Sequence, residues 1–171
     1  MSAPAQRVTP LTIFVPLKFG GATWMRLLLF SARHLAFVTA PLRQLSFIHY
    51  ARWTVLPGRW LHFESNFDGD LPQYIDTFAH ALRWRMRLAW GMGRGYPGLV
   101  PADRYARWSD SHTSADDHFY AAYPDASTGM VGAGLRLLPR FERLRAAVDG
   151  ADAATFEREY LRFLTDVQHD I

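Results

Sequence analysis

The residues best suited to chemistry lie in the stretch 46–69, SFIHYARWTVLPGRWLHFESNFDG. Apolar and polar residues alternate on both sides of a central Pro-Gly pair, which predicts two antiparallel strands joined by a tight turn. This turn would bring His49 close to Asp68, and Arg52 close to Glu64. A carboxylate that orients an imidazole prepares it for general-base work or axial metal ligation. The candidate catalytic residues are therefore His49, Arg52 and Asp68.

The same cluster also has a structural interpretation. Asp68-Gly69 is a common turn element whose carboxylate often caps backbone amides. Arg52 could simply pair with Glu64 across the sheet, as many strand neighbours of opposite charge do. The residue pattern is compatible with both roles.

Two further histidines, His112 and His118, flank Asp116-Asp117. Imidazole and carboxylate ligands suit zinc or iron. However, the helical HExxH spacing is absent, and a strand beginning near His118 would point alternate side chains apart. Surface loop residues are the simpler interpretation, so no metal site is predicted. If a haem binds, His112, His118, His49 and His34 are all conceivable proximal ligands, and the sequence does not choose between them.

A nucleic-acid partner is not expected. Arg83, Arg85 and Arg87 lie beside aromatic residues, but a helix spreads the three arginines around its circumference and forms no single basic groove. The formal net charge is only +3. We interpret this small positive balance as spread along the chain, which gives little reason to expect nucleic acid or an anionic membrane.

Hydrophobic periodicity predicts the elements that position these residues. Short runs rich in β-branched or aromatic residues favour a first strand at 11–18 and a fourth at 118–124, in addition to the hairpin. Apolar residues at three- and four-residue steps predict helices at 22–40, 70–91, 127–148 and 152–169. Asp70 suits the N-cap of the second helix, and Pro139 predicts a kink or a split in the third. Residues 91–116 form a long connection, with one helical turn expected around 103–108. A connection of this length is typical of a lid or binding loop.

This order, β-α-β-β-α-β followed by helices, predicts an α+β fold. We expect a ferredoxin-like, four-stranded antiparallel sheet with helices on one face, plus two C-terminal helices. The expected parts are a flexible leader at 1–10, the ferredoxin-like domain at 11–124, and a helical extension at 125–171 packed on the same domain. A chain of 171 residues can bury a core without staples, and the absence of cysteine excludes disulfides and thiolate chemistry.

No membrane span or export signal is expected. The N-terminal MSAPAQRVTP lacks the basic-then-apolar pattern of a signal peptide, so we expect a cytoplasmic location. The helix at 22–40 is too short and too charged to span a bilayer. It is better interpreted as a buried helix or as one that covers a partner.

The element order over 11–124, with IHYAR at 48–52 and SNFDG at 65–69, resembles the dimeric α+β barrel superfamily. That superfamily includes dye-decolourising haem peroxidases, chlorite dismutase-like proteins and antibiotic-biosynthesis-type monooxygenases. SNFDG is similar to the glycine-and-aspartate segment that dye-decolourising peroxidases place on the distal side of haem, although the preceding glycine is absent here. The resemblance implies a homodimer with paired sheets and a pocket between sheet and helices. It also makes haem a possible cofactor, with Arg52 and Asp68 as the distal arginine and aspartate.

Two functions are compatible with these features. The first is a small oxidoreductase, or a protein that handles haem or another apolar or aromatic small molecule in an aromatic-lined pocket under the long loop. Its candidate cofactor-binding residues are Asn66, Phe67, His112 and His118. The second is a non-catalytic binding or assembly module that docks on a protein partner through its apolar first helix and its C-terminal helices.

Overall fold

The computed structural model describes residues 8–35, 40, 45–98, 101–115 and 118–169. It divides into two compact units, Met1–Asp125 and Ala126–Ile171, called unit 1 and the hairpin unit below. The combination of a sheet with helices confirms an α+β fold.

Unit 1 is built on an antiparallel sheet with the strand order β2-β3-β1-β4. Its strands are β1 (Val8–Pro16), β2 (Ile48–Leu56), β3 (Trp60–Asp68) and β4 (Thr113–Ser114). The predicted hairpin is formed by β2 and β3, and β1 pairs with β3 along its whole length. The turn at 57–59 uses a glycine with a positive φ of 76° at Gly58, a conformation that costs glycine little.

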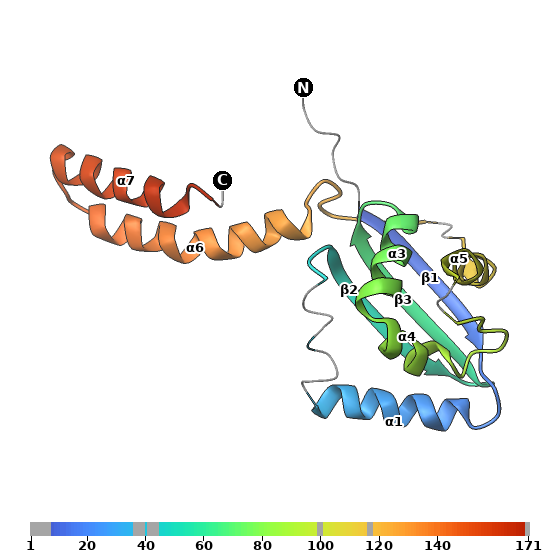
Figure 1. Cartoon of the computed structure of the whole chain (residues 1–171). Helices are drawn as coiled ribbons and strands as arrows, with labels where there is room; N and C mark the ends of the chain where they lie inside the picture. The colour runs from blue at the N-terminus through green and yellow to red at the C-terminus, as the bar shows by residue number, and fades with distance from the viewer. Residues whose placement is uncertain (1–7, 36–39, 41–44, 99–100, 116–117, 170–171) are drawn as a thin grey trace. The chain divides into compact units, whose positions relative to one another are not determined.

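Helices cover one face of this sheet (Figure 1). They are α1 (Gly21–His34), α3 (Leu71–Ala81), α4 (Arg83–Trp90) and α5 (Ala102–Asp110). The start of α3 is fixed as the sequence predicts, because the Asp70 carboxylate accepts a hydrogen bond from the Gln73 amide at 2.9 Å.

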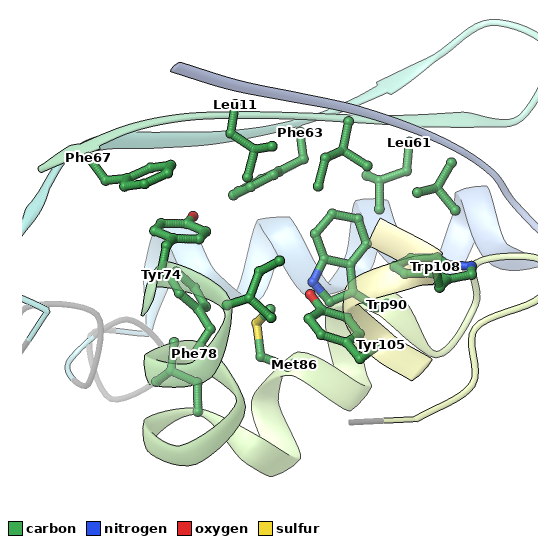
Figure 2. Packing of buried hydrophobic residues seen from close by; sticks show 14 of the residues in the cluster. Leu11, Leu61, Phe63, Phe67, Tyr74, Phe78, Met86, Trp90, Tyr105 and Trp108 are labelled. Carbon is green, nitrogen blue, oxygen red and sulfur yellow. The ribbon is translucent and has the colours of Figure 1, made fainter. Parts of the chain in front are cut away.

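The core of unit 1 lies between the sheet and these helices. Figure 2 shows Phe63 and Phe67 pointing from β3 toward Tyr74 and Phe78 of α3 and Trp90 of α4. The ring centroids of Phe67 and Tyr74 are 4.0 Å apart, and those of Phe63 and Trp90 are 5.4 Å apart. Such aromatic pairs contribute both buried area and favourable ring geometry.

The hairpin unit consists of α6 (Thr128–Val148) and α7 (Ala153–Val167). Ser127 and Asp152 cap their N-termini through hydrogen bonds to the amides of Met130 and Thr155. Pro139 does not split α6, which continues through it. Phe141 faces Phe163 across the two helices, with ring centroids 6.3 Å apart.

The predicted fourth strand at 118–124 is wrong. The fourth strand is instead Thr113–Ser114, which pairs with Thr12 and Ile13 of β1. It forms because the preceding helix, α5, returns the chain to the free edge of β1, where the His112 carbonyl accepts a hydrogen bond from the Phe14 amide. Residues 118–124 hold exposed aromatic side chains and form no strand.

Other predicted boundaries also change. β1 begins at Val8, inside the expected leader. The single helix expected at 70–91 is interrupted at Leu82, whose φ of −120° and ψ of 23° leave helical geometry while its side chain stays buried. The expected turn near 103–108 is the full helix α5, and α1 ends at His34, with 36–39 outside the described residues. No helix in the described part of the chain is long and apolar enough to cross a membrane.

Candidate functional site

His49 and Asp68 form the closest pair of candidate catalytic residues. The His49 Nε2 atom lies 2.7 Å from the Asp68 Oδ1 atom. Ile48 opposes Phe67 and Tyr50 opposes Asn66, so His49 is the extra residue of a β-bulge. A bulge re-aims the side chain that it contains, and here it directs the imidazole to the end of β3. The proximity expected from the hairpin is confirmed.

The Asp68 carboxylate is almost fully buried, and the imidazole is partly open to solvent. The exposed fractions of the two side chains are 4% for Asp68 and 23% for His49. The Asp68 amide donates to the Phe47 carbonyl at 2.8 Å, and the Thr9 hydroxyl donates to the Gly69 carbonyl at 2.6 Å. These bonds anchor the backbone that carries Asp68, and its carboxylate orients the imidazole through the contact with Nε2.

The other residues of the SNFDG segment also have structural partners. The Ser65 hydroxyl donates to the Tyr50 carbonyl at 3.1 Å. Phe67 is fully buried against Tyr74, so its side chain belongs to the core. Asn66 pairs with Pro10 and Tyr50 in the sheet and is partly exposed. The segment therefore builds the corner between β3 and α3 as well as carrying the candidate site.

Arg52 belongs to a second polar cluster. Its Nη2 atom donates to the Glu64 Oε2 atom, and the other Glu64 oxygen lies 3.4 Å from the His62 Nε2 atom. The His62 ring stacks on Phe14, with centroids 4.6 Å apart. Glu64 precedes Asp68 by four residues on β3, a separation of about 13 Å. Arg52 therefore pairs as the structural interpretation expects, and does not join His49 and Asp68.

This second cluster lies on the open face of the sheet, the face opposite α1, α3, α4 and α5. Its side chains alternate with those of the core along β1, β2 and β3. Glu64 is the partner that sequence spacing predicts for Arg52. The period-two alternation of β3 places His62 on the same face as Glu64.

The two later histidines do not join the pair. The His112 Nδ1 atom lies 2.8 Å from the Trp108 carbonyl, and the His112 backbone contacts β1 at Phe14. Phe14 lies six residues along β1 from Val8, which pairs with Asp68, so His112 is about 20 Å away. His118 is exposed beyond β4. Among the described residues, no three metal-ligating side chains come together.

The described core between sheet and helices leaves little room for the predicted ligand pocket. The cavity between them has a volume of about 10 Å³ and is lined by core side chains such as Leu11, Phe63, Phe78 and Trp90. Pockets for drug-sized ligands measure about 300–1,000 Å³. Of the aromatic residues expected to line a pocket, Phe63, Phe67 and Phe78 fill the core, whereas Trp24, Phe119 and Tyr123 are exposed, and a haem does not fit at this position.

A shallow groove of about 440 Å³ lies between α3 and α5. Leu71, Ile75 and Ala106 are among its apolar lining residues, and Asp103 and Arg107 are among its charged ones. Arg107 donates a hydrogen bond to Asp103 at 2.9 Å, and this bond lowers the pKa of the Asp103 carboxyl. None of the candidate site residues lines this groove.

Burial raises the pKa values of three tyrosine side chains in unit 1. Burial raises the pKa of Tyr74, and the hydroxyl of Ser65 offsets part of that rise. Burial also raises the pKa of Tyr105, with a smaller contribution from the neighbouring phenols. The pKa of Tyr96 is raised to about 12 by burial, against the opposing charge of Arg87.

The His49–Asp68 pair is the arrangement best suited to chemistry. With Nε2 engaged by the carboxylate, Nδ1 is the imidazole nitrogen left to accept a proton or a ligand. Searches of protein-family models, curated proteins and solved structures found no match to the chain.

Proposed function

We propose that the protein is a non-catalytic assembly module that self-associates through its hairpin unit. The observation that carries this proposal is a line of exposed apolar side chains on α6, called the α6 stripe: Val131, Leu135 and Leu138. Leu135 is 70% exposed and Leu138 is 56% exposed. Their spacing of four and three residues places all three on one side of the helix.

The α6 stripe lies on a part of α6 that α7 does not cover. The Arg140 guanidinium donates to the Asp166 carbonyl, next to the last residue of α7. Because the two helices run antiparallel, the α6 residues before Arg140 extend past the end of α7 (Figure 1). No side chain of α6 is fully buried, and Val167 is the buried side chain of α7.

A hairpin with so little buried surface is poorly stabilised. Isolated helices are marginal in water, and most helical stability in proteins comes from packing an apolar face. Domains of this size rarely supply a sufficient core alone. Covering the α6 stripe would remove apolar surface from water and stabilise both helices.

A second copy of the hairpin unit is the occupant that its charge favours. Residues 126–171 contain six arginines and seven acidic residues, so two copies would meet without strong repulsion. Two hairpins related by a two-fold axis would form a four-helix bundle, a common solution for amphipathic helices.

Light scattering after size-exclusion chromatography tests this proposal. We expect the full chain to elute with twice its monomer mass of 19.6 kDa, and Leu135→Ser/Leu138→Ser to elute at the monomer mass. Leu27→Ser/Phe30→Ser removes a similar exposed pair from unit 1 and should stay dimeric. A monomeric wild type, or a double variant on α6 that stays dimeric, would contradict the proposal.

The His49–Asp68 pair favours a second candidate, an oxidoreductase or a protein that handles haem or another apolar ligand. In this candidate, the imidazole oriented by Asp68 accepts a proton or a ligand at Nδ1. The ligand would approach the partly exposed side of His49, since the core is filled. An absorption spectrum with and without added haem tests it: a Soret band that His49→Ala removes and His112→Ala retains would support a haem site. An unchanged haem spectrum would contradict the haem site, and the assembly role would be the remaining candidate.

The strand order β2-β3-β1-β4, with the helices of unit 1 on one face, supports a ferredoxin-like arrangement. It also supports the proposed relation to the dimeric α+β barrel superfamily, in which sheets pair across a dimer. Trp60→Ser changes an exposed residue at the start of β3 and distinguishes the two dimers. Loss of the dimer in this variant, with retention in Leu135→Ser/Leu138→Ser, would favour pairing through the sheet.

A further inference from the structure

The first helix of unit 1 has a second apolar side that its own core does not use. Met25 points inward and is fully buried, whereas Leu27 is 61% exposed and Phe30 is 64% exposed. Phe19, just before the helix, is 91% exposed. Leu27 and Phe30 are three residues apart, so they project from the same side of α1. An exposed pair of this size, with an aromatic residue beside it, indicates a contact surface.

The charge in this part of the sequence has one sign. No acidic residue precedes Glu64, while seven basic residues do, which corrects the expectation that positive charge is spread along the chain. Arg26 and Arg33 of α1 are exposed on the flank of Leu27 and Phe30. Lys18 is adjacent to Phe19 and donates a hydrogen bond to the Gly91 carbonyl at 2.9 Å. The apolar side chains therefore project among cations without a neighbouring acidic residue in α1.

We propose that this side of α1 binds the surface of an anionic lipid bilayer. A helix with Phe and Leu on one side and arginines beside them lies in the interface, with its apolar side chains at the boundary of headgroups and acyl chains. Anionic headgroups attract the arginines, and the apolar residues leave water. Since α1 is too short and charged to span a bilayer, the contact is with the surface.

The combination of residues favours lipid over other partners. A nucleic acid would use the arginines but would leave the aliphatic Leu27 without a suitable contact. A protein surface that covered Leu27 and Phe30 would also need carboxylates placed opposite Arg26 and Arg33. An anionic bilayer supplies both the negative charge and the apolar layer at once.

Co-sedimentation with vesicles tests the proposal on the full chain. We expect binding to mixed phosphatidylcholine–phosphatidylserine vesicles, weaker binding to pure phosphatidylcholine, and loss of binding as salt is raised. Leu27→Ser/Phe30→Ser should weaken binding at least about tenfold, because both side chains leave water on binding. Either Arg26→Gln or Arg33→Gln should weaken vesicle binding about fivefold. The control Tyr120→Ser/Tyr123→Ser removes two more exposed rings of unit 1 and should bind as wild type does.

Several outcomes would overturn the proposal. They are equal binding to both kinds of vesicle, no binding to either, or unchanged binding in Leu27→Ser/Phe30→Ser. Binding to duplex DNA in the absence of vesicle binding would identify the surface as a nucleic-acid site. If Leu27→Ser/Phe30→Ser abolished dimer formation and the wild type ignored vesicles, the surface would be a protein interface.

A labelled variant locates the contact. Because the chain has no cysteine, Phe19→Cys introduces a unique thiol for a polarity-sensitive fluorophore. We expect its emission to shift to the blue when phosphatidylserine-containing vesicles are added. The same label at Tyr120→Cys, on an exposed residue outside α1, should not shift. No shift at Phe19→Cys, or equal shifts at both positions, would contradict insertion at α1.

Discussion

Unit 1 and the hairpin unit use similar amphipathic patterns with opposite results. In unit 1, seventeen of the described residues form one buried apolar cluster between the sheet and its helices. In the described part of the hairpin unit, Val167 is the buried apolar residue, and the α6 stripe is exposed. The difference is the presence of a facing element, because an apolar helix face is stabilised only by what covers it. Unit 1 supplies its own cover, and we propose that a second copy of the chain covers the hairpin unit.

The largest expected effect is the loss of a core ring from unit 1. Phe67→Ala removes a fully buried ring that stacks on Tyr74, and should lower the free energy of unfolding by about 3–5 kcal/mol. Phe156→Ala removes a half-exposed ring of α7 and should leave the unfolding of unit 1 unchanged. Urea denaturation measures both. Equal losses of unfolding free energy in the two variants would contradict the difference proposed between the two units.

A smaller effect separates the two polar pairs of unit 1. Asp68→Asn removes the charge from a nearly buried hydrogen bond and should cost about 2 kcal/mol of unfolding free energy at neutral pH. Glu64→Gln alters the more exposed pair with Arg52 and should cost less than about 1 kcal/mol. Urea denaturation of the two variants provides the comparison. A larger loss of unfolding free energy in Glu64→Gln would show that the Arg52–Glu64 pair contributes more to stability than the His49–Asp68 pair.

Alkaline pH should weaken unit 1 through its buried phenols. Burial raises the pKa values of Tyr74 and Tyr105 above the unfolded value of about 10. Unfolding therefore releases protons above this pH, so their stabilisation is complete below about pH 10 and falls as the pH rises toward the folded pKa values. Tyr105→Phe should reduce the slope of unfolding free energy against pH above pH 10. An unchanged slope in this variant would contradict the assignment.

The smallest expected effect compares the helix caps of the two units. Asp70→Ala removes the cap of α3, and Asp152→Ala removes the cap of α7. Each substitution should lower the stability of its own helix by about 1 kcal/mol. Only Asp152→Ala should also weaken the dimer, because the proposed dimer forms through the hairpin unit. Circular dichroism measures the stability of the helices, and light scattering measures the dimer. A dimer weakened equally by Asp70→Ala would argue against association through the hairpin unit.

Local pattern was sufficient to predict the β2–β3 hairpin and its contacts. A short turn fixes strand register, so the pairing of Arg52 with Glu64 follows from sequence spacing, whereas the contact of His49 with Asp68 also depends on the bulge at His49. The cap at Asp70 is also predicted from sequence, because an acidic side chain placed before an apolar periodic segment has a clear local role.

Features set by distant contacts could not be predicted in this way. β4 is two residues long, which is too short to show an alternating pattern. It forms because α5 brings these residues to the edge of β1. Rings such as Phe63 and Phe78 have the same spacing whether they line a pocket or fill a core. Packing of α3, α4 and α5 decides between these two outcomes, and sequence periodicity does not contain that information.

Hydrogen–deuterium exchange of the full chain at two concentrations tests the contrast between the units most directly. At a high concentration, where the dimer forms, we expect the amides of α6 and of the β1–β3 sheet to be protected. After dilution below the dissociation constant, we expect α6 to exchange rapidly while the sheet stays protected. Protection of α6 that is independent of concentration, and unchanged in Leu135→Ser/Leu138→Ser, would contradict the proposal that a second copy stabilises the hairpin unit.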